Sequence, residues 1–183
     1  MSMTWHDPVK LISLSWLLGL ALLSPIAAES QVSTMETLLA PLDDGGYQLC
    51  TEPAPQDWHD GSGACLNILK QGTTLEGYYG YPHSGSFICL RGQLSENWLE
   101  GQGLVISWAG NAWQDIPQET FIWDHPEERL SLSQGKLVRS EGVAEEQVRW
   151  IIFQTARLNM QSMYLYDRPR MTSPMQLCDW SLE

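Results

Sequence analysis

The sequence predicts an all-β protein with one antiparallel domain over residues 45–180, barrel-like or, alternatively, a two-sheet sandwich. Short apolar runs alternate with turn residues at a spacing of about 8–12 residues, which is typical of barrels and sandwiches. No long amphipathic helical pattern occurs, which argues against α/β architectures. The chain has 183 residues, 43% of them hydrophobic, and so has the size and composition of one globular domain.

The first 28 residues have the composition of a secretory signal peptide. A short head ends at Lys10, an apolar run occupies residues 11–23, and Pro25 precedes small residues up to Ala28. This order is typical of export signals. The apolar run is shorter than the about 20 residues that a membrane span needs. We therefore expect cleavage between Ala28 and Glu29 and no permanent membrane span afterwards, with an uncleaved anchor as the alternative.

The remaining elements follow in chain order. Residues 29–44 are expected to form a linker or a short helical lead-in. Strands are expected at 47–51, 64–70, 73–81, 86–93, 98–108, 119–123, 130–133, 136–139 and 147–155. Gly101 and Gly103 indicate a bulge or bend, and Gln134-Gly135 indicates a hairpin turn. For residues 156–166 we expect a turn or short helix and then a strand. We expect the sheet to close, or nearly close, into a lipocalin-like barrel.

Four cysteines follow the signal segment, and an even number in an exported chain predicts disulfides. Of the three connectivities that four cysteines allow, we favour Cys50–Cys65 together with Cys89–Cys178. The first pair closes an excursion rich in Pro, Asp and Gly, and the second ties the C-terminal tail to a central strand. The sequence spacings do not match those of metal-binding cysteines.

The chain is acidic, with 22 Asp and Glu against 10 Lys and Arg and a net charge of -12. Nucleic-acid binding depends on clustered positive charge, so no nucleic-acid partner is expected. The negative charge is concentrated in residues 29–128. An acidic face that docks a basic partner is therefore one hypothesis, and a solvated surface is the simpler one.

Two segments, GTTLEGYYGYPHSGSFICLRG at 72–92 and WIIFQTARLNMQSMYLY at 150–166, carry a family resemblance. Together with Gly46-Tyr47 and the late Cys178, their order resembles a group of exported cyanobacterial proteins that have no assigned activity. The resemblance implies export and a Cys89–Cys178 pair, and it makes Cys50 and Cys65 an additional pair of this chain. It implies no functional residues.

Aromatic side chains are the most unusual feature, with nine tryptophans in the chain. Aromatic rings line apolar pockets and stack on sugars, and the mouth of a small barrel is a natural ligand site. We expect a pocket or rim that binds a small apolar or sugar ligand, built from Tyr79, Tyr81, Trp113 and Trp123. Tyr79 and Tyr81 can share one face of a strand, whereas Tyr78 must point to the other.

Catalysis and metal binding find little support. His83-Ser84 lacks the surroundings of an activated serine and is explained by a tight turn. The acidic clusters at 57–60 and 124–128 lack the spacing of metal sites, so no metal ligands and no cofactor are assigned.

The sequence thus predicts an exported, non-catalytic binding protein of the periplasm, the thylakoid lumen or the medium. The alternatives are an envelope-associated protein that docks a protein partner on an acidic face and, less favoured, a hydrolase.

Overall fold

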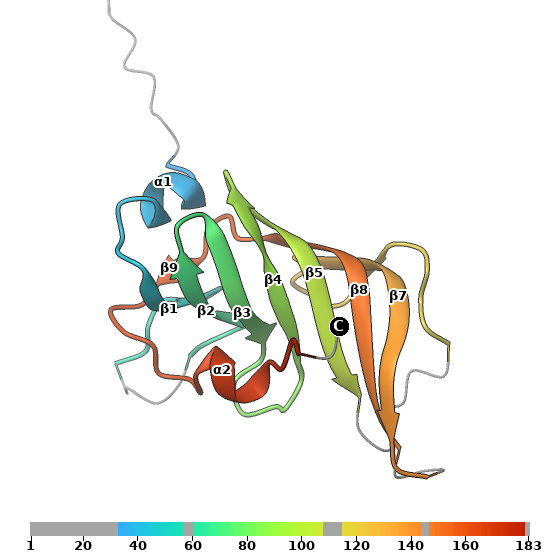
Figure 1. Ribbon diagram of the computed structural model, residues 1–183. Coiled ribbons are helices and arrows are strands. Elements are labelled where there is room, and N and C mark those ends of the chain that lie inside the picture. Colours follow the sequence, from blue (N-terminus) through green and yellow to red (C-terminus); the bar gives the residue numbers. More distant parts are fainter. Residues whose placement is uncertain (1–32, 57–60, 108–114, 144–146, 182–183) are drawn as a thin grey trace, which may run out of the picture. The chain divides into compact units, whose positions relative to one another are not determined.

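The computed structural model describes residues 33–56, 61–107, 115–143 and 147–181. Within these ranges, nine strands form one antiparallel sheet (Figure 1). The strands are β1 (Gly45–Cys50), β2 (Cys65–Gln71), β3 (Thr74–Gly80), β4 (Phe87–Ser95), β5 (Trp98–Ser107), β6 (Phe121–Ile122), β7 (Leu130–Glu141), β8 (Val148–Asn159) and β9 (Tyr164–Leu165). Two short helices accompany them, α1 (Met35–Leu39) and α2 (Pro174–Leu177).

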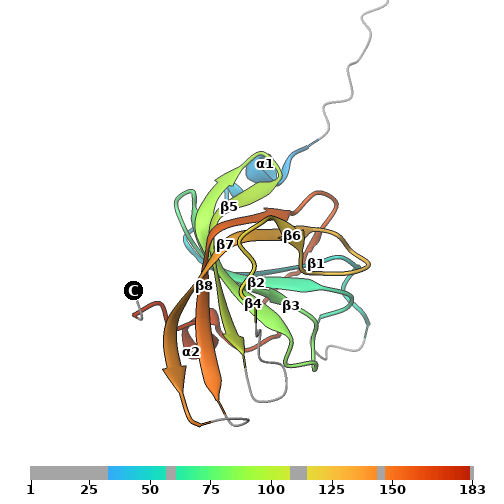
Figure 2. The ribbon, with the colours of Figure 1, turned by 90° about the vertical axis from the view of Figure 1, so that its right-hand side faces the viewer.

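The sheet order is β6-β7-β8-β5-β4-β3-β2-β1-β9. Strands β1 to β5 are consecutive neighbours in the sheet, and β8 pairs with the free side of β5. The sheet curls into a half-barrel with β6 and β9 at its two edges (Figure 2). The predicted all-β, antiparallel, barrel-like domain is confirmed, and a single sheet takes the place of the two that a sandwich requires.

One face of the sheet, the core face, carries the main hydrophobic core. Side chains alternate between the faces along each strand. Gly77 and Tyr79 of β3 therefore lie on the core face, opposite the core residues Leu90 and Ile88 of β4. The buried cluster also includes residues of β1, β2, β5, β7 and β8, among them Leu49, Ile68, Val105, Leu132 and Phe153. Side chains from strands on both sides of the curled sheet therefore pack together over this face.

Helix α1 lies in the segment predicted to be a linker or a short helical lead-in. Thr34 caps it by accepting a hydrogen bond from the Thr37 N–H. Met35 and Leu39 are buried in the main core, and the Met35 N–H donates to Asn97 at 2.7 Å. This lead-in is thus packed onto the sheet.

The predicted bulge at Gly101 and Gly103 is confirmed by a shift in the β5–β8 register between these two residues. The predicted hairpin at Gln134-Gly135 is wrong, because β7 runs straight through it from Leu130 to Glu141. Gln134 does have a positive φ of 57°. The N–H groups of Gln134 and Gly135 donate to the carbonyls of residues 117–118. The backbone irregularity at these two residues therefore serves to contact a neighbouring segment and does not reverse the chain.

The expectation for residues 156–166 is confirmed for the turn and the strand after it and is wrong for residues 156–159. Strand β8 continues through Ala156 to Asn159, and a turn then leads into β9. The buried Ala156, Leu158 and Met160 follow the alternating pattern, which prevails over the helical spacing of the same segment.

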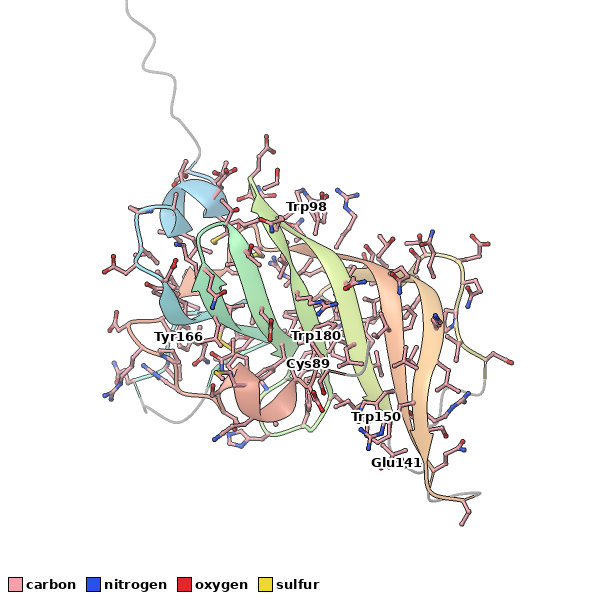
Figure 3. All side chains as sticks on the ribbon, in the orientation of Figure 1. Cys89, Trp98, Glu141, Trp150, Tyr166 and Trp180 are labelled. Atoms are coloured by element: carbon pink, nitrogen blue, oxygen red, sulfur yellow. A yellow bond between two sulfur atoms is a disulfide. The ribbon has the colours of Figure 1, made fainter. Side chains whose placement is uncertain are left out.

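The opposite, outer face of β1 to β4 is covered by residues 166–180, which we call the C-terminal strap. In Figure 3 the strap passes from Tyr166 to Trp180 across this face. It covers a second buried cluster that includes Tyr78, Cys89, Leu104 and Ile152. Both predicted disulfides are present, Cys50–Cys65 within the β1–β2 pair and Cys89–Cys178 between β4 and the strap.

Replacing Gly135 by alanine should destabilise the protein. A Cβ atom there would lie 2.5 Å from Ile116 Cγ2, 2.8 Å from the Phe153 ring and 2.9 Å from the Pro117 carbonyl oxygen. Overpacking typically costs about 1–3 kcal/mol, and we expect Gly135→Ala to lower the free energy of unfolding in urea by that amount. Gly45→Ala is the control, because nothing lies within 4 Å of its new Cβ. Equal stability of the two variants would contradict the packing described for β7.

Candidate functional site

Three of the four aromatic residues predicted to form a ligand site come together at one end of the sheet. The Trp123 ring lies 6.1 Å from the Tyr79 ring and 6.2 Å from the Tyr81 ring. Trp113 lies outside the described residues. The shared face of Tyr79 and Tyr81 follows from their spacing of two along the end of β3.

Tyr79 is a core residue with no exposed surface. Its hydroxyl donates to the buried Asp124 carboxylate at 2.7 Å, and the same carboxylate accepts the N–H groups of Arg129 at 3.0 Å and Leu130 at 2.7 Å. Burial, followed by the hydrogen bond to Asp124, raises the pKa of Tyr79 well above its ordinary value. Asp124 therefore anchors the turn before β7 to the core.

Tyr81 and Trp123 form the half-buried part of this aromatic group. The Tyr81 hydroxyl donates to the Glu127 carboxylate. Desolvation and then this hydrogen bond raise the pKa of Tyr81 above the ordinary range of a tyrosine. The phenol stays protonated at physiological pH and acts as a donor.

A pocket of about 340 Å³ opens beside Tyr81, between the β3–β4 hairpin and the strap. Tyr81 is the only residue of the predicted aromatic set among those that line it within the described chain. The strand residues Tyr78 and Phe87 contribute rings from the outer face, with their centroids 5.5 Å apart in an edge-to-face arrangement. The remaining walls come from the last residue of β3, from the connecting loop and from the strap: Gly80, Pro82, His83, Gly85, Met171, Thr172 and Leu177.

The loop that forms the rim of the pocket is a tight turn, as the sequence indicates for His83 and Ser84. His83 and Gly85 have positive φ angles of 61° and 64°. The Ser84 hydroxyl donates to the Tyr81 carbonyl at 2.7 Å, and the Ser86 N–H donates to that hydroxyl at 3.0 Å. These bonds give Ser84 a structural task in closing the turn.

Sequence reasoning missed four apolar members of the pocket: Tyr78, Phe87, Met171 and Leu177. It placed Tyr78 correctly on the face opposite Tyr79, but it did not predict that another segment of the chain packs on that face. The signal was present in the predicted Cys89–Cys178 pair, because that bond brings the C-terminal tail beside β4, next to Phe87.

The described acidic cluster, at 124–128, has a structural role. The cluster at 57–60 lies outside the described residues, and Asp124 of the second cluster is occupied by Tyr79 and backbone N–H groups. The described parts of the chain contain no group of three His, Cys, Asp or Glu side chains arranged to hold a metal ion.

Comparison with protein-family models, curated proteins and solved structures gives no match for this chain. In the portion of the chain that the structure describes, no helix has the length and apolar character needed to cross a membrane. The two disulfides fit a non-reducing compartment.

Removing the Tyr79 hydroxyl should cost more stability than removing that of Tyr81. Tyr79→Phe leaves the buried Asp124 carboxylate short of a donor, and we expect a loss of about 1–3 kcal/mol in urea unfolding. Tyr81→Phe is the matched control, because water can reach the half-buried Glu127, and about 0.5 kcal/mol or less is expected. Equal losses would mean that Asp124 does not depend on Tyr79.

The stability difference between the wild type and Tyr79→Phe should narrow at alkaline pH. The pKa of Tyr79 is raised in the folded state, so above pH of about 10 the unfolded chain loses this proton while the folded chain keeps it. The wild type therefore loses stability as the pH rises, and phenylalanine contributes no such loss. Urea titrations on both sides of that pH measure the difference, and a constant difference would show that Tyr79 ionises alike in both states.

Proposed function

We propose that this chain is an exported, non-catalytic binding protein that holds a small, largely apolar molecule with a planar ring. The observation that carries the proposal is the pocket between the β3–β4 hairpin and the strap. Its volume of about 340 Å³ lies at the lower end of the range for small-molecule sites, which are mostly apolar with a few polar groups. That size suits a ligand of two or three rings.

The lining supports a planar ligand. Tyr78 and Phe87 already meet edge to face, an arrangement that a third ring can extend, since aromatic rings prefer edge-to-face and offset contacts. Met171 adds a polarisable, adaptable side chain. His83 and Thr172 supply polar groups to the wall and give the site a means of orienting its ligand.

Export is supported by the signal-like composition of the first 28 residues and by the two disulfides. We place the working protein in the periplasm, the thylakoid lumen or the medium. In such a compartment, a disulfide-bonded half-barrel with a lateral pocket suits the task of carrying or sequestering a small molecule.

Filling the pocket should abolish binding. The probe is the fluorescent dye anilinonaphthalene sulfonate, whose fused rings match the expected ligand class, titrated into the full chain with both disulfides formed. Thr172 is exposed and lines the pocket, so Thr172→Trp fills it without disturbing the core, and the Kd for the dye should rise about tenfold or more.

Met175→Trp provides the matched control. Met175 is 76% exposed, lies in the same strap and does not line this pocket. We expect the control to bind the dye like the wild type. Equal binding by both variants, or no binding by the wild type, would count against the proposed site.

A further inference from the structure

The C-terminal strap supplies one wall of the proposed ligand pocket. Met171, Thr172 and Leu177 belong to the strap, whereas Tyr78 and Phe87 belong to the β3–β4 hairpin. The labelled positions of Cys89 and Trp180 in Figure 3 show where the end of the strap meets the sheet. The pocket therefore exists only while the strap lies against the outer face.

Hydrogen bonds fix the first half of the strap. The Arg170 N–H donates to the buried Gln48 side chain at 2.6 Å. The Thr172 carbonyl accepts from Asn67 at 2.6 Å and from the Tyr78 hydroxyl at 2.7 Å. Buried polar groups that are satisfied in this way are costly to separate, so the strap is held firmly up to Thr172.

The second half of the strap depends on a covalent bond. Helix α2 has only four residues, and an isolated helix of that length is not stable. Cys178 follows Leu177 directly and is bonded to Cys89, while Trp180 lies under the Arg91 guanidinium at 4.4 Å. The Cys89–Cys178 bond therefore holds the Leu177 wall of the pocket in place.

The other disulfide lies beneath the first half of the strap, where Cys50 and Cys65 pack against Tyr166 and Met171. Cys50 and Cys65 face each other in the β1–β2 ladder, in register with the neighbouring backbone pairs. Neither cysteine lines the pocket. Breaking this bond leaves two strands that backbone hydrogen bonds still hold together, and the strap beside it stays fixed by the hydrogen bonds of Arg170 and Thr172. It is therefore an internal control for the first bond.

We infer that the Cys89–Cys178 disulfide is a redox-controlled clasp of the ligand pocket, an inference that rests on the proposed binding function. A dithiol reductant opens it. One thiolate attacks the Sγ of Cys178, the more exposed of the two residues, and forms a mixed disulfide while Cys89 leaves as a thiolate and takes a proton. The second thiol of the reductant then displaces Cys178, so the reductant ends as a disulfide and the protein gains two thiols. The strap beyond Thr172 is released and the ligand is lost.

The test compares dye binding by the wild type, by the Cys89→Ala/Cys178→Ala double variant and by the Cys50→Ala/Cys65→Ala double variant. Far-ultraviolet circular dichroism confirms that each variant keeps its sheet. We expect the first double variant to raise the Kd for anilinonaphthalene sulfonate about tenfold or more. The second double variant should bind like the wild type.

A second measurement needs no variant. The wild type is treated with graded dithiothreitol, free thiols are alkylated, and peptide mass mapping gives the reduced fraction of each disulfide. Loss of bound dye should follow the reduction of Cys89–Cys178 and be independent of Cys50–Cys65. Unchanged dye binding after reduction of Cys89–Cys178 would overturn the clasp and leave the binding function intact. Absence of dye binding by the oxidised wild type would instead overturn the binding function itself.

Discussion

The structure depends on one constraint. A single curled sheet has two faces with apolar side chains to shield from water, and curling shields only the inner, core face. On the core face, side chains of β1 to β4 meet those of β7 and β8 in one buried cluster. On the outer face of β1 to β4, Tyr78 and Cys89 would be exposed without another layer. The strap supplies that layer, and the Cys89–Cys178 bond fixes it there.

The path of the strap explains why its contacts occur in the order they do. After β8 the chain returns to pair as β9 with β1 at the far edge of the sheet. It then recrosses the outer face, so that Arg170 meets Gln48 of β1, Thr172 meets Asn67 of β2, and Cys178 reaches β4. Strand β3 contributes the Tyr78 hydroxyl, which donates to the same Thr172 carbonyl as Asn67. The polar contacts fix the register of the strap, while the apolar contacts and the disulfide supply its stability.

The sequence predicted the fold class because the alternating pattern and the turn residues act locally. It also predicted both disulfides and the bulge at Gly101. It failed at Gln134-Gly135, where a positive φ and a glycine are typical of a turn. The glycine is required there by Ile116 and Phe153, which approach from distant parts of the chain. Such a tertiary contact leaves no local signature.

The candidate site was predicted in part, for a similar reason. The spacing of Tyr79 and Tyr81 placed them correctly on one face of β3, and Trp123 joins them. The residues that surround these tyrosines could not be predicted from the sequence spacing. The Tyr79 hydroxyl is hydrogen-bonded to Asp124, and Tyr79 is part of the core. The pocket lies on the other side of Tyr81. Locating that space requires the path of the strap, which is a long-range property.

The pocket is built from segments that are far apart in the chain, since Phe87 of β4 and Leu177 of the strap both line it. No single strand or helix holds both walls in position. The free energy that docks the strap and the free energy that keeps the pocket formed therefore come from the same contacts. A ligand that touches both walls must stabilise the docked strap, because it binds that arrangement and not the released one. For the ligand proposed above, binding and strap docking form one coupled equilibrium, which the Cys89–Cys178 bond shifts toward the docked state.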